Sequence, residues 1–289
     1  MRKMAAIKLP YIGAHVSANG GFGEALVRAE AMGATAMQIF GSSPRMWRAR
    51  MPLAADARAF KAAYEKSTVK GLYLHAAYLV NVASSSPTIY NSSIQSLIDH
   101  LSIVEAIGGD GLIFHIGSSK GGTREEALAK EIMAIKKVLH AVPGKAKLLM
   151  ENTAGGGEKI GVGIDEMAQM FNEVNSERLK ICFDTAHAFE AGAVSAYTKE
   201  SVKSLFNAWD KAIGVENIEV IHANDSKTES GSHHDRHENI GAGFIGLDGF
   251  KALAGDKRLR DKAWILEVPG FHELGPDKEN IDILKSCFK

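Results

Sequence analysis

Short apolar runs alternate along the chain with longer amphipathic segments, and this pair of patterns occurs eight times. Apolar runs such as Leu112-Ile113-Phe114 do not alternate polar with apolar residues, which is typical of strands buried on both faces of a parallel sheet. The predicted strands are residues 11–16, 36–40, 72–75, 111–115, 147–151, 180–184, 219–222 and 263–267.

The segments between these runs have the spacing of amphipathic helices. From Glu125 to Leu139, apolar residues recur every three or four positions, while Lys and Glu occupy the other face. Thr123 and Glu126 have the spacing of a capping box at the start of this helix. The predicted helices are residues 23–32, 54–67, 89–107, 123–141, 164–174, 198–213, 247–254 and 278–288.

Eight strand–helix units in 289 residues predict an α/β fold of the (β/α)8, or TIM, barrel type, as a single domain over residues 1–289. An open doubly wound sheet is the alternative, and the absence of G-x-G-x-x-G after the first strand disfavours it. Three glycines, at 155–157, follow the fifth strand. We expect the loop there to turn closely around a ligand or a neighbouring backbone.

Composition gives no sign of a charged partner. The 34 Lys and Arg balance the 34 Asp and Glu, so any basic surface must be local. Two cysteines, Cys182 and Cys287, are too few for a disulfide framework and are compatible with a reducing cytosol. No apolar run approaches membrane-spanning length, and residues 1–6 lack a signal-peptide core. We expect a cytoplasmic monomer with no membrane partner.

Six of the eight predicted strands end in a His, Asp or Glu, residue types that commonly bind metal ions. In barrel enzymes the carboxyl ends of the strands carry the chemistry, and a carboxylate or imidazole at the end of a buried strand needs a partner. These ends therefore predict one site with several metal ions. The residues are His75, His115, Glu151, Asp184, His222 and Glu267, with His187 three positions after Asp184.

The loop after the seventh strand adds two more candidate ligands. Asp235 and His237 are two positions apart, so in an extended loop their side chains point the same way and can hold one ion. Glu151 and Glu267 can each bridge two ions, because a carboxylate has two oxygens. The donors are nitrogen and oxygen with no thiolate, which favours catalytic zinc, manganese or iron over a structural zinc site.

One histidine at a strand end is more often a hydrogen-bonded core or rim residue than a metal ligand, so the joint pattern carries this prediction. His15 ends the first strand and is a candidate for supporting a ligand by a hydrogen bond.

Taken together, these residues resemble the endonuclease IV family of apurinic/apyrimidinic (AP) endonucleases. The matching segments occur in family order and cover essentially the whole chain. They are residues 13–17 (GAHVS), 75–81 (HAAYLVN), 151–155 (ENTAG), 184–192 (DTAHAFEAG), 222–226 (HANDS), 235–237 (DRH) and 241–246 (GAGFIG).

The resemblance implies a barrel that holds three zinc ions, with manganese as an alternative metal at one or more sites. All nine ligand positions carry the expected residue types. The implied ligands are His75, His115 and Glu151 for the first ion, Glu151, Asp184, His222 and Glu267 for the second, and His187, Asp235 and His237 for the third.

The activity that the resemblance implies is hydrolysis of the phosphodiester 5′ to an abasic site in duplex DNA. The products are a 3′-hydroxyl and a 5′-deoxyribose phosphate, as in base excision repair, with repair phosphodiesterase activity at blocked 3′ ends. Metal ions suit this reaction because they lower the pKa of water and stabilise a leaving oxygen. Glu151 is the predicted catalytic residue that orients the attacking water, since it alone is expected to contact both ions of a pair.

The resemblance further implies that Arg45, Tyr78 and Leu79 enter the minor groove and hold open the gap at the abasic nucleotide. Arg45 lies in a loop with Trp47 and Arg48, and Tyr78 follows shortly after His75. A Trp beside arginines is also common in packed loops, and Tyr78 also fits a rim aromatic, so the residues alone leave both interpretations open.

Two loops depart from the family pattern without removing a ligand. The chain reads Ile116-Gly117-Ser118-Ser119 where the family has Pro-Gly-Ser-His, and Glu267-Val268-Pro269 where it has Glu-Thr-Pro. Two other functions stay open. One is a metal-dependent sugar isomerase or epimerase on a similar barrel, which needs one or two ions. The other is a binding protein that keeps the fold without the chemistry.

Overall fold

The structure is a computed structural model that describes residues 9–43 and 45–289. Two features of the sequence analysis lie outside the described residues. They are the segment 1–6, where no signal peptide is expected, and Pro44, in the loop expected to contact DNA.

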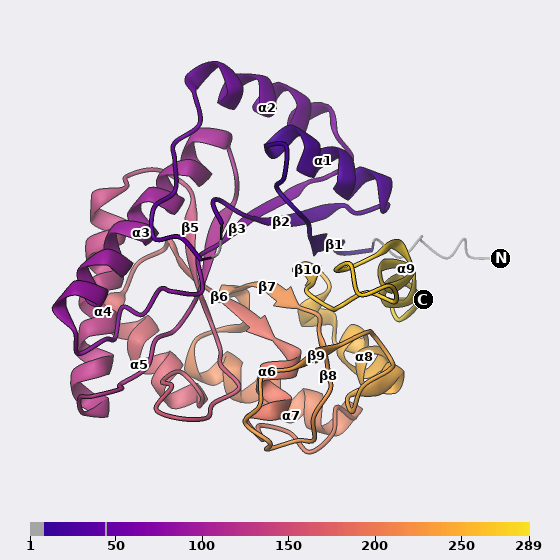
Figure 1. Ribbon diagram of the computed structural model, residues 1–289. Helices are drawn as coiled ribbons and strands as arrows, with labels where there is room; N and C mark the ends of the chain where they lie inside the picture. Colours follow the sequence, from indigo (N-terminus) through magenta and orange to yellow (C-terminus); the bar gives the residue numbers. More distant parts are fainter. Residues whose placement is uncertain (1–8, 44) are drawn as a thin grey trace.

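Eight parallel strands close into a barrel in the order β1-β10-β7-β6-β5-β4-β3-β2, and helices surround it (Figure 1). The predicted TIM barrel is therefore confirmed. The observed strands lie within one residue of the predicted bounds. They are β1 (Tyr11–His15), β2 (Ala36–Phe40), β3 (Gly71–His75), β4 (Gly111–His115), β5 (Lys147–Glu151), β6 (Leu179–Asp184), β7 (Ile218–His222) and β10 (Ala263–Leu266).

The eight predicted helices are also present, with bounds within two residues of the expected ones. The capping box at Thr123 and Glu126 forms as predicted. The helices are α1 (Phe22–Ala31), α2 (Ala54–Lys66), α3 (Pro87–Ile107), α4 (Arg124–Ala141), α5 (Ile164–Val174), α7 (Lys199–Ala212), α8 (Gly246–Gly255) and α9 (Lys278–Ser286).

Several short elements were not expected from the sequence, because elements this short have no measurable period. The six-residue helix α6 (Thr185–Glu190) begins directly after β6, with Asp184 as its N-cap. The polar loop after β7 contains a two-stranded antiparallel ribbon of β8 (Asp225–Ser226) and β9 (His237–Glu238). Two 3-10 turns, η1 (Val215–Asn217) and η2 (Lys257–Leu259), are present as well.

A small apolar cluster fills the barrel interior, separate from the larger core between strands and helices. Its members are Ala36, Tyr73, Ile113, Leu149, Cys182, Val220, Ala263 and Ile265. Cys182 therefore packs as a small buried apolar residue. Side chains alternate along a strand, so residues two positions after these point into the same interior, nearer to the carboxyl ends.

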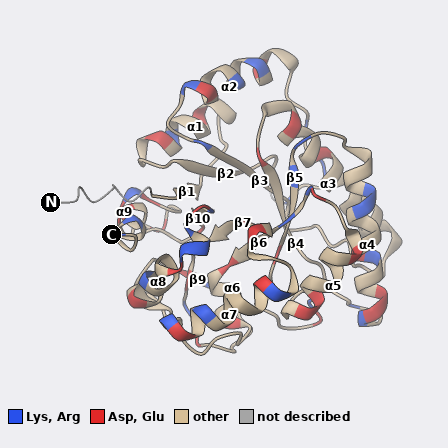
Figure 2. Ribbon diagram, turned by 180° about the vertical axis from the view of Figure 1, so that it is seen from behind, with Lys and Arg blue, Asp and Glu red and all other residues tan. Residues whose placement is uncertain are grey.

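The outer surface carries both signs of charge. In Figure 2, Lys and Arg are interspersed with Asp and Glu along the outer helices, in keeping with the balanced composition. Over the described residues, no helix combines the length and the apolar character that a bilayer crossing requires.

Glu131 of α4 gives the protein an expected pH-dependent stability. The residue is fully buried, and neither carboxylate oxygen has a hydrogen-bond partner among the described residues. Burial raises the pKa of Glu131 to about 8, and the nearby Gly117 amide, outside hydrogen-bond geometry, offsets part of this effect. The folded protein thus retains a proton that the unfolded chain releases near pH 4.5. Stability is therefore expected to fall as the pH rises from about 4.5 to 8.

The variant Glu131→Gln is expected to lose this pH dependence and to exceed the wild type by roughly 3 kcal/mol in unfolding free energy at pH 7. The two proteins should have similar stabilities near pH 4.5. Denaturant unfolding at both pH values measures this, with Glu125→Gln on the exposed face of α4 as the control. Parallel pH profiles for Glu131→Gln and the wild type would contradict the assignment.

Candidate metal centre

Every barrel strand carries, at or near its carboxyl end, a polar residue that points into the barrel interior. Seven of these residues lie two positions after a member of the interior apolar cluster, and the eighth lies two positions after Gly13 of β1. The strand geometry therefore gathers them above the apolar cluster. They are His15, Gln38, His75, His115, Glu151, Asp184, His222 and Glu267.

The first predicted set of ligands meets around one oxygen of Glu151. His75 Nε2 and His115 Nε2 each lie 3.1 Å from Glu151 Oε2. His75 Nδ1 donates to the carbonyl of Ala76 at 2.8 Å. Since that carbonyl can only accept, Nδ1 carries a hydrogen, and in the neutral ring Nε2 has the lone pair. A positive charge between this nitrogen and the carboxylate stabilises a contact of 3.1 Å, and either a proton on Nε2 or a bound metal ion supplies it.

The second set meets around the other oxygen of the same carboxylate. His222 Nδ1 lies 2.9 Å from Glu151 Oε1, 3.3 Å from Glu267 Oε2 and 3.8 Å from Asp184 Oδ2. One donor atom from each of these four residues falls within a group no wider than 4.8 Å. The two oxygens of Glu151 thus face two different groups of donors, which is the geometry that a bridging carboxylate requires.

The third set lies at the rim. Asp235 Oδ1 is 3.3 Å from His187 Nε2 and 3.7 Å from His237 Nε2, and His237 Nε2 is 3.8 Å from Asp184 Oδ2. His187 Nδ1 donates a hydrogen bond to the carbonyl of Asn152 at 2.9 Å. In the neutral ring, the lone pair of Nε2 is then free to bind a metal ion. Both Nε2 atoms are buried and have no hydrogen-bond partner within residues 9–43 and 45–289. A cation here would satisfy both.

The loop that presents Asp235 is held from two sides. Arg236 N donates to Glu190 Oε1 at 3.2 Å. On the other side, Gly155 and Gly156 have φ angles of 83° and 82°, and a Cβ on either would come within 2.8 Å of His233. The close approach expected at the three glycines is therefore to a neighbouring loop.

Charges at the site favour cations. Burial alone would raise the pKa of Glu151, but His115 and His222 outweigh burial and hold that pKa well below its usual range. Burial alone would lower the pKa of His187, yet Asp184 and Asp235 raise it well above its usual value. Divalent cations would supply the same positive charge while the imidazoles stay neutral.

The donor set fits three divalent cations held by nitrogen and oxygen. Cys182 Sγ also lies near Glu151 and His222. Burial raises the pKa of that thiol to about 12, so it stays protonated and is a poor ligand. The combination of imidazoles and carboxylates is typical of catalytic zinc, with manganese as the alternative.

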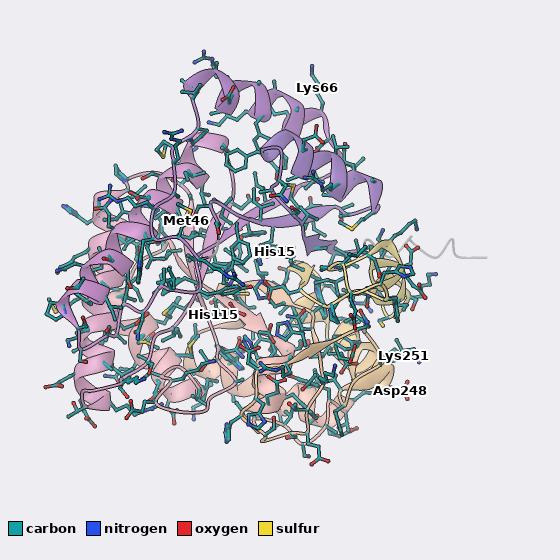
Figure 3. All side chains as sticks on the ribbon, viewed as in Figure 1. His15, Met46, Lys66, His115, Asp248 and Lys251 are labelled. Atoms are coloured by element: carbon teal, nitrogen blue, oxygen red, sulfur yellow. The ribbon has the colours of Figure 1, made fainter. Side chains whose placement is uncertain are left out.

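The centre opens into a cavity of about 550 Å³ whose lining includes Phe40, Tyr78 and Arg236 beside the candidate ligands. Figure 3 places His15 and His115 near the middle of the molecule, whereas Lys66 and Asp248 lie at its periphery. Tyr78 stands at the cavity with 65% of its surface exposed, and Leu79 beside it is 38% exposed. Arg45 is exposed and does not line the cavity.

Three amide side chains that support the ligands were missed by the sequence analysis. Asn224 Nδ2 donates to Asp184 Oδ2 at 2.7 Å, and Asn152 Nδ2 donates to the carbonyl of Asp184 at 3.1 Å. Gln38 contacts His222 and Glu267. A signal for Gln38 existed, since it is a polar residue inside the apolar run of β2. His15 Nδ1 lies 2.9 Å from Gln38 Nε2 and 3.5 Å from Glu267 Oε1, and its role in supporting a ligand stays a prediction.

The loop 116–119, which departs from the family pattern, is held in place by its neighbours. Ser118 N donates to Asn81 Oδ1 at 3.1 Å, and Ser119 N donates to the carbonyl of Glu158 at 2.8 Å. Ile160 N donates to the carbonyl of Gly117 at 3.1 Å. His115 therefore leads into a fixed loop despite the altered sequence.

Comparisons with known proteins agree with this architecture. Residues 26–287 match a family described as "Xylose isomerase-like TIM barrel". A probable endonuclease 4 from Solibacter usitatus is 37% identical over 279 residues, which is 95% of this chain and 96% of that protein. Endonuclease 4 from Thermus thermophilus is 36% identical, over 96% of this chain and 98% of that one. The chain belongs to the endonuclease IV family.

Solved structures resemble this chain at two levels, one in both sequence and fold and one in fold alone. The crystal structure of endonuclease IV from another strain of Thermus thermophilus superposes with a TM-score of 0.84 at 36% identity, and covers 96% of this chain and 98% of that one. A D-tagatose 3-epimerase-like protein superposes with a TM-score of 0.72 at 18% identity, with 95% and 96% covered. That second likeness shows the fold alone. The predicted endonuclease IV family, and with it the hydrolase class of enzyme, are confirmed.

Proposed function

We propose that this endonuclease IV family member is a metal-dependent AP endonuclease. It hydrolyses the phosphodiester 5′ to an abasic site in duplex DNA and leaves a 3′-hydroxyl and a 5′-deoxyribose phosphate. It acts as a cytoplasmic monomer in base excision repair, and it also removes blocking groups from 3′ ends. The observation that carries the proposal is the third group of donors, His187, Asp235 and His237, because a sugar isomerase needs no third ion.

Each group of residues has a role in the proposed reaction. His75, His115 and Glu151 would hold one ion, Glu151, Asp184, His222 and Glu267 would hold a second, and His187, Asp235 and His237 would hold a third. When bound, such ions lower the pKa of a water and offset charge on a phosphate. Glu151 positions the attacking water, because its two oxygens face both inner groups of donors. Arg236 lines the cavity and offers a guanidinium to the phosphate.

Substrate selection follows from the shape of the cavity. An abasic nucleotide has no base to unstack, so turning it out of the duplex costs little. A cavity of about 550 Å³ has room for the sugar and its phosphate. Tyr78 and Leu79 at the rim, with Arg45 from the loop after β2, fill the gap that the nucleotide leaves.

A labelled duplex with one tetrahydrofuran abasic analogue tests the proposal, because this analogue cannot undergo β-elimination. Zinc-loaded protein is expected to cut once, 5′ to the lesion, and the upstream fragment should be extendable by a polymerase, as a 3′-hydroxyl requires. Intact duplex without a lesion is the control substrate. No incision by zinc-loaded protein, together with epimerisation of a ketose, would replace the proposal with the sugar epimerase alternative.

Tyr78→Ala is expected to weaken binding of the abasic duplex by about 10- to 100-fold, because an aromatic group that stacks on a base contributes about 1–3 kcal/mol. The zinc content should not change, since Tyr78 contributes no donor atom to the three groups. Fluorescence anisotropy and metal analysis measure the two quantities. Tyr11→Ala is the matched control, because Tyr11 is 41% exposed at the amino end of β1, the end opposite to the metal centre. Loss of zinc in Tyr78→Ala would contradict the assigned role.

A further inference from the structure

Gln38 is the one amide among the eight inward-pointing strand-end residues. It lies in the middle of β2 within the run Ala36-Met37-Gln38-Ile39-Phe40, and its exposed fraction is 0%. A buried amide with no hydrogen-bond partner would destabilise the fold, so the side chain of Gln38 is expected to be hydrogen-bonded. Among the described residues, the contacts of its side-chain amide all go to other members of the same set of strand-end residues.

The amide group makes three contacts. Its nitrogen lies 2.6 Å from Glu267 Oε1 and 2.9 Å from His15 Nδ1. Its oxygen lies 2.8 Å from His222 Nε2. These contacts join the middle of β2 to the ends of β1 and β7 and to the residue after β10, and they use both hydrogens of the amide nitrogen.

The charge of Glu267 fixes which way the amide points. A carboxylate that binds a metal ion does so in its ionised form. An ionised carboxylate only accepts hydrogen bonds, so the amide atom 2.6 Å from it must be the nitrogen. The amide oxygen therefore faces His222 Nε2, and that nitrogen must carry the hydrogen.

This hydrogen decides which nitrogen of His222 can bind a metal. With Nε2 protonated, Nδ1 carries the lone pair, and Nδ1 is the atom that faces Glu151, Glu267 and Asp184 at 2.9–3.8 Å. Gln38 also occupies Oε1 of Glu267, which leaves Oε2 to face the same position. One amide thus orients two of the four candidate ligands of the second ion.

We propose that Gln38 is a positioning residue of the metal centre, which holds His222 in the tautomer with the hydrogen on Nε2 and turns one oxygen of Glu267 toward the second ion. The inference deepens the proposed function and rests on its metal centre. Hydrogen bonds behind metal ligands of this kind contribute about 10- to 100-fold to metal affinity.

The first test compares zinc release from the loaded wild type and from Gln38→Met, which keeps the length of the side chain without its amide. A chromophoric chelator in excess reports the release of each bound ion over time. One ion is expected to leave at least about tenfold faster from Gln38→Met, while the others leave at the wild-type rate. Tyr73→Phe is the control, because it removes the bond from Tyr73 Oη to Glu219 at the other end of the same interior.

The second test reads the tautomer in the loaded wild-type protein, so it does not depend on a variant that folds. Long-range ¹H–¹⁵N correlation of histidine rings, with His222 assigned by the loss of its signals in His222→Gln, is expected to show a protonated Nε2 and an unprotonated Nδ1. A hydrogen on Nδ1 would overturn the inference. Zinc release from Gln38→Met within twofold of the wild type would also overturn it.

The two tests separate this inference from the proposed function. If wild-type protein binds no divalent cation, the proposed metal centre itself fails, and the role of Gln38 falls with it. If the wild type binds zinc and incises abasic DNA while Gln38→Met retains every ion, the proposed function stands and only the inference about Gln38 fails.

Discussion

Replacing Glu151 with glutamine is expected to lower the rate of incision by about a thousandfold or more and to release at least one zinc ion per chain. The carboxylate is fully buried, and its two oxygens face two groups of donors. An amide keeps one acceptor oxygen and places an NH₂ group, which cannot bind a cation, toward the other group. The bridge between two ions is therefore lost in a side chain of unchanged size.

Single-turnover incision and metal analysis measure the two effects on the same preparation. Glu200→Gln, an exposed substitution of the same kind in the first turn of α7, should match the wild type in both assays. An incision rate for Glu151→Gln within tenfold of the wild type, at full zinc content, would show that Glu151 neither bridges ions nor positions the water.

Asp235→Ala is expected to reduce zinc from three ions to two per chain and to slow incision by about a hundredfold. Burial alone would raise the pKa of Asp235, but His187 and His237 outweigh it and hold the pKa low. Among the described residues, the Asp235 carboxylate forms ion pairs only with these two histidines and Lys159, and with no ligand of the inner two groups. The inner pair of ions should therefore stay bound.

Asp248→Ala is the control, because Asp248 is 96% exposed on α8. Zinc per chain and the rate of incision are measured as for Glu151→Gln. Loss of all three ions from Asp235→Ala would mean that the third group of donors is not a separate site. Unchanged zinc and rate would mean that it holds no ion.

The barrel could be predicted from the sequence because its two patterns, the apolar runs of the strands and the helical spacing of the helices, are strong and local. The run Leu112-Ile113-Phe114 predicts a buried strand, and the apolar face from Glu125 to Leu139 predicts a helix. Eight repeats of this strand–helix pair are compatible with few topologies. The juxtaposition of strand ends such as His75 and Glu151 follows from closure of the barrel. Those residues could be grouped before any distance was known.

Other parts of the site depend on contacts between segments far apart in the chain. His187 reaches Asp235 because α6 begins directly after β6, a turn too short to leave a periodic pattern. Gln38 stands out as a polar residue in an apolar run, but its partners, His222 and Glu267, appear only from the distances. The closeness of Gly155 to His233 likewise depends on how two loops pack. Single-sequence patterns carry no information on such pairs.

The most direct test of a hydrolytic metal centre is incision of the tetrahydrofuran duplex by protein stripped with a chelator and then titrated with zinc. The account predicts no incision by stripped protein. It predicts that activity returns as bound zinc approaches three ions per chain, and that manganese restores part of it. Incision by stripped protein at the wild-type rate, or none after full loading with zinc, would contradict the account.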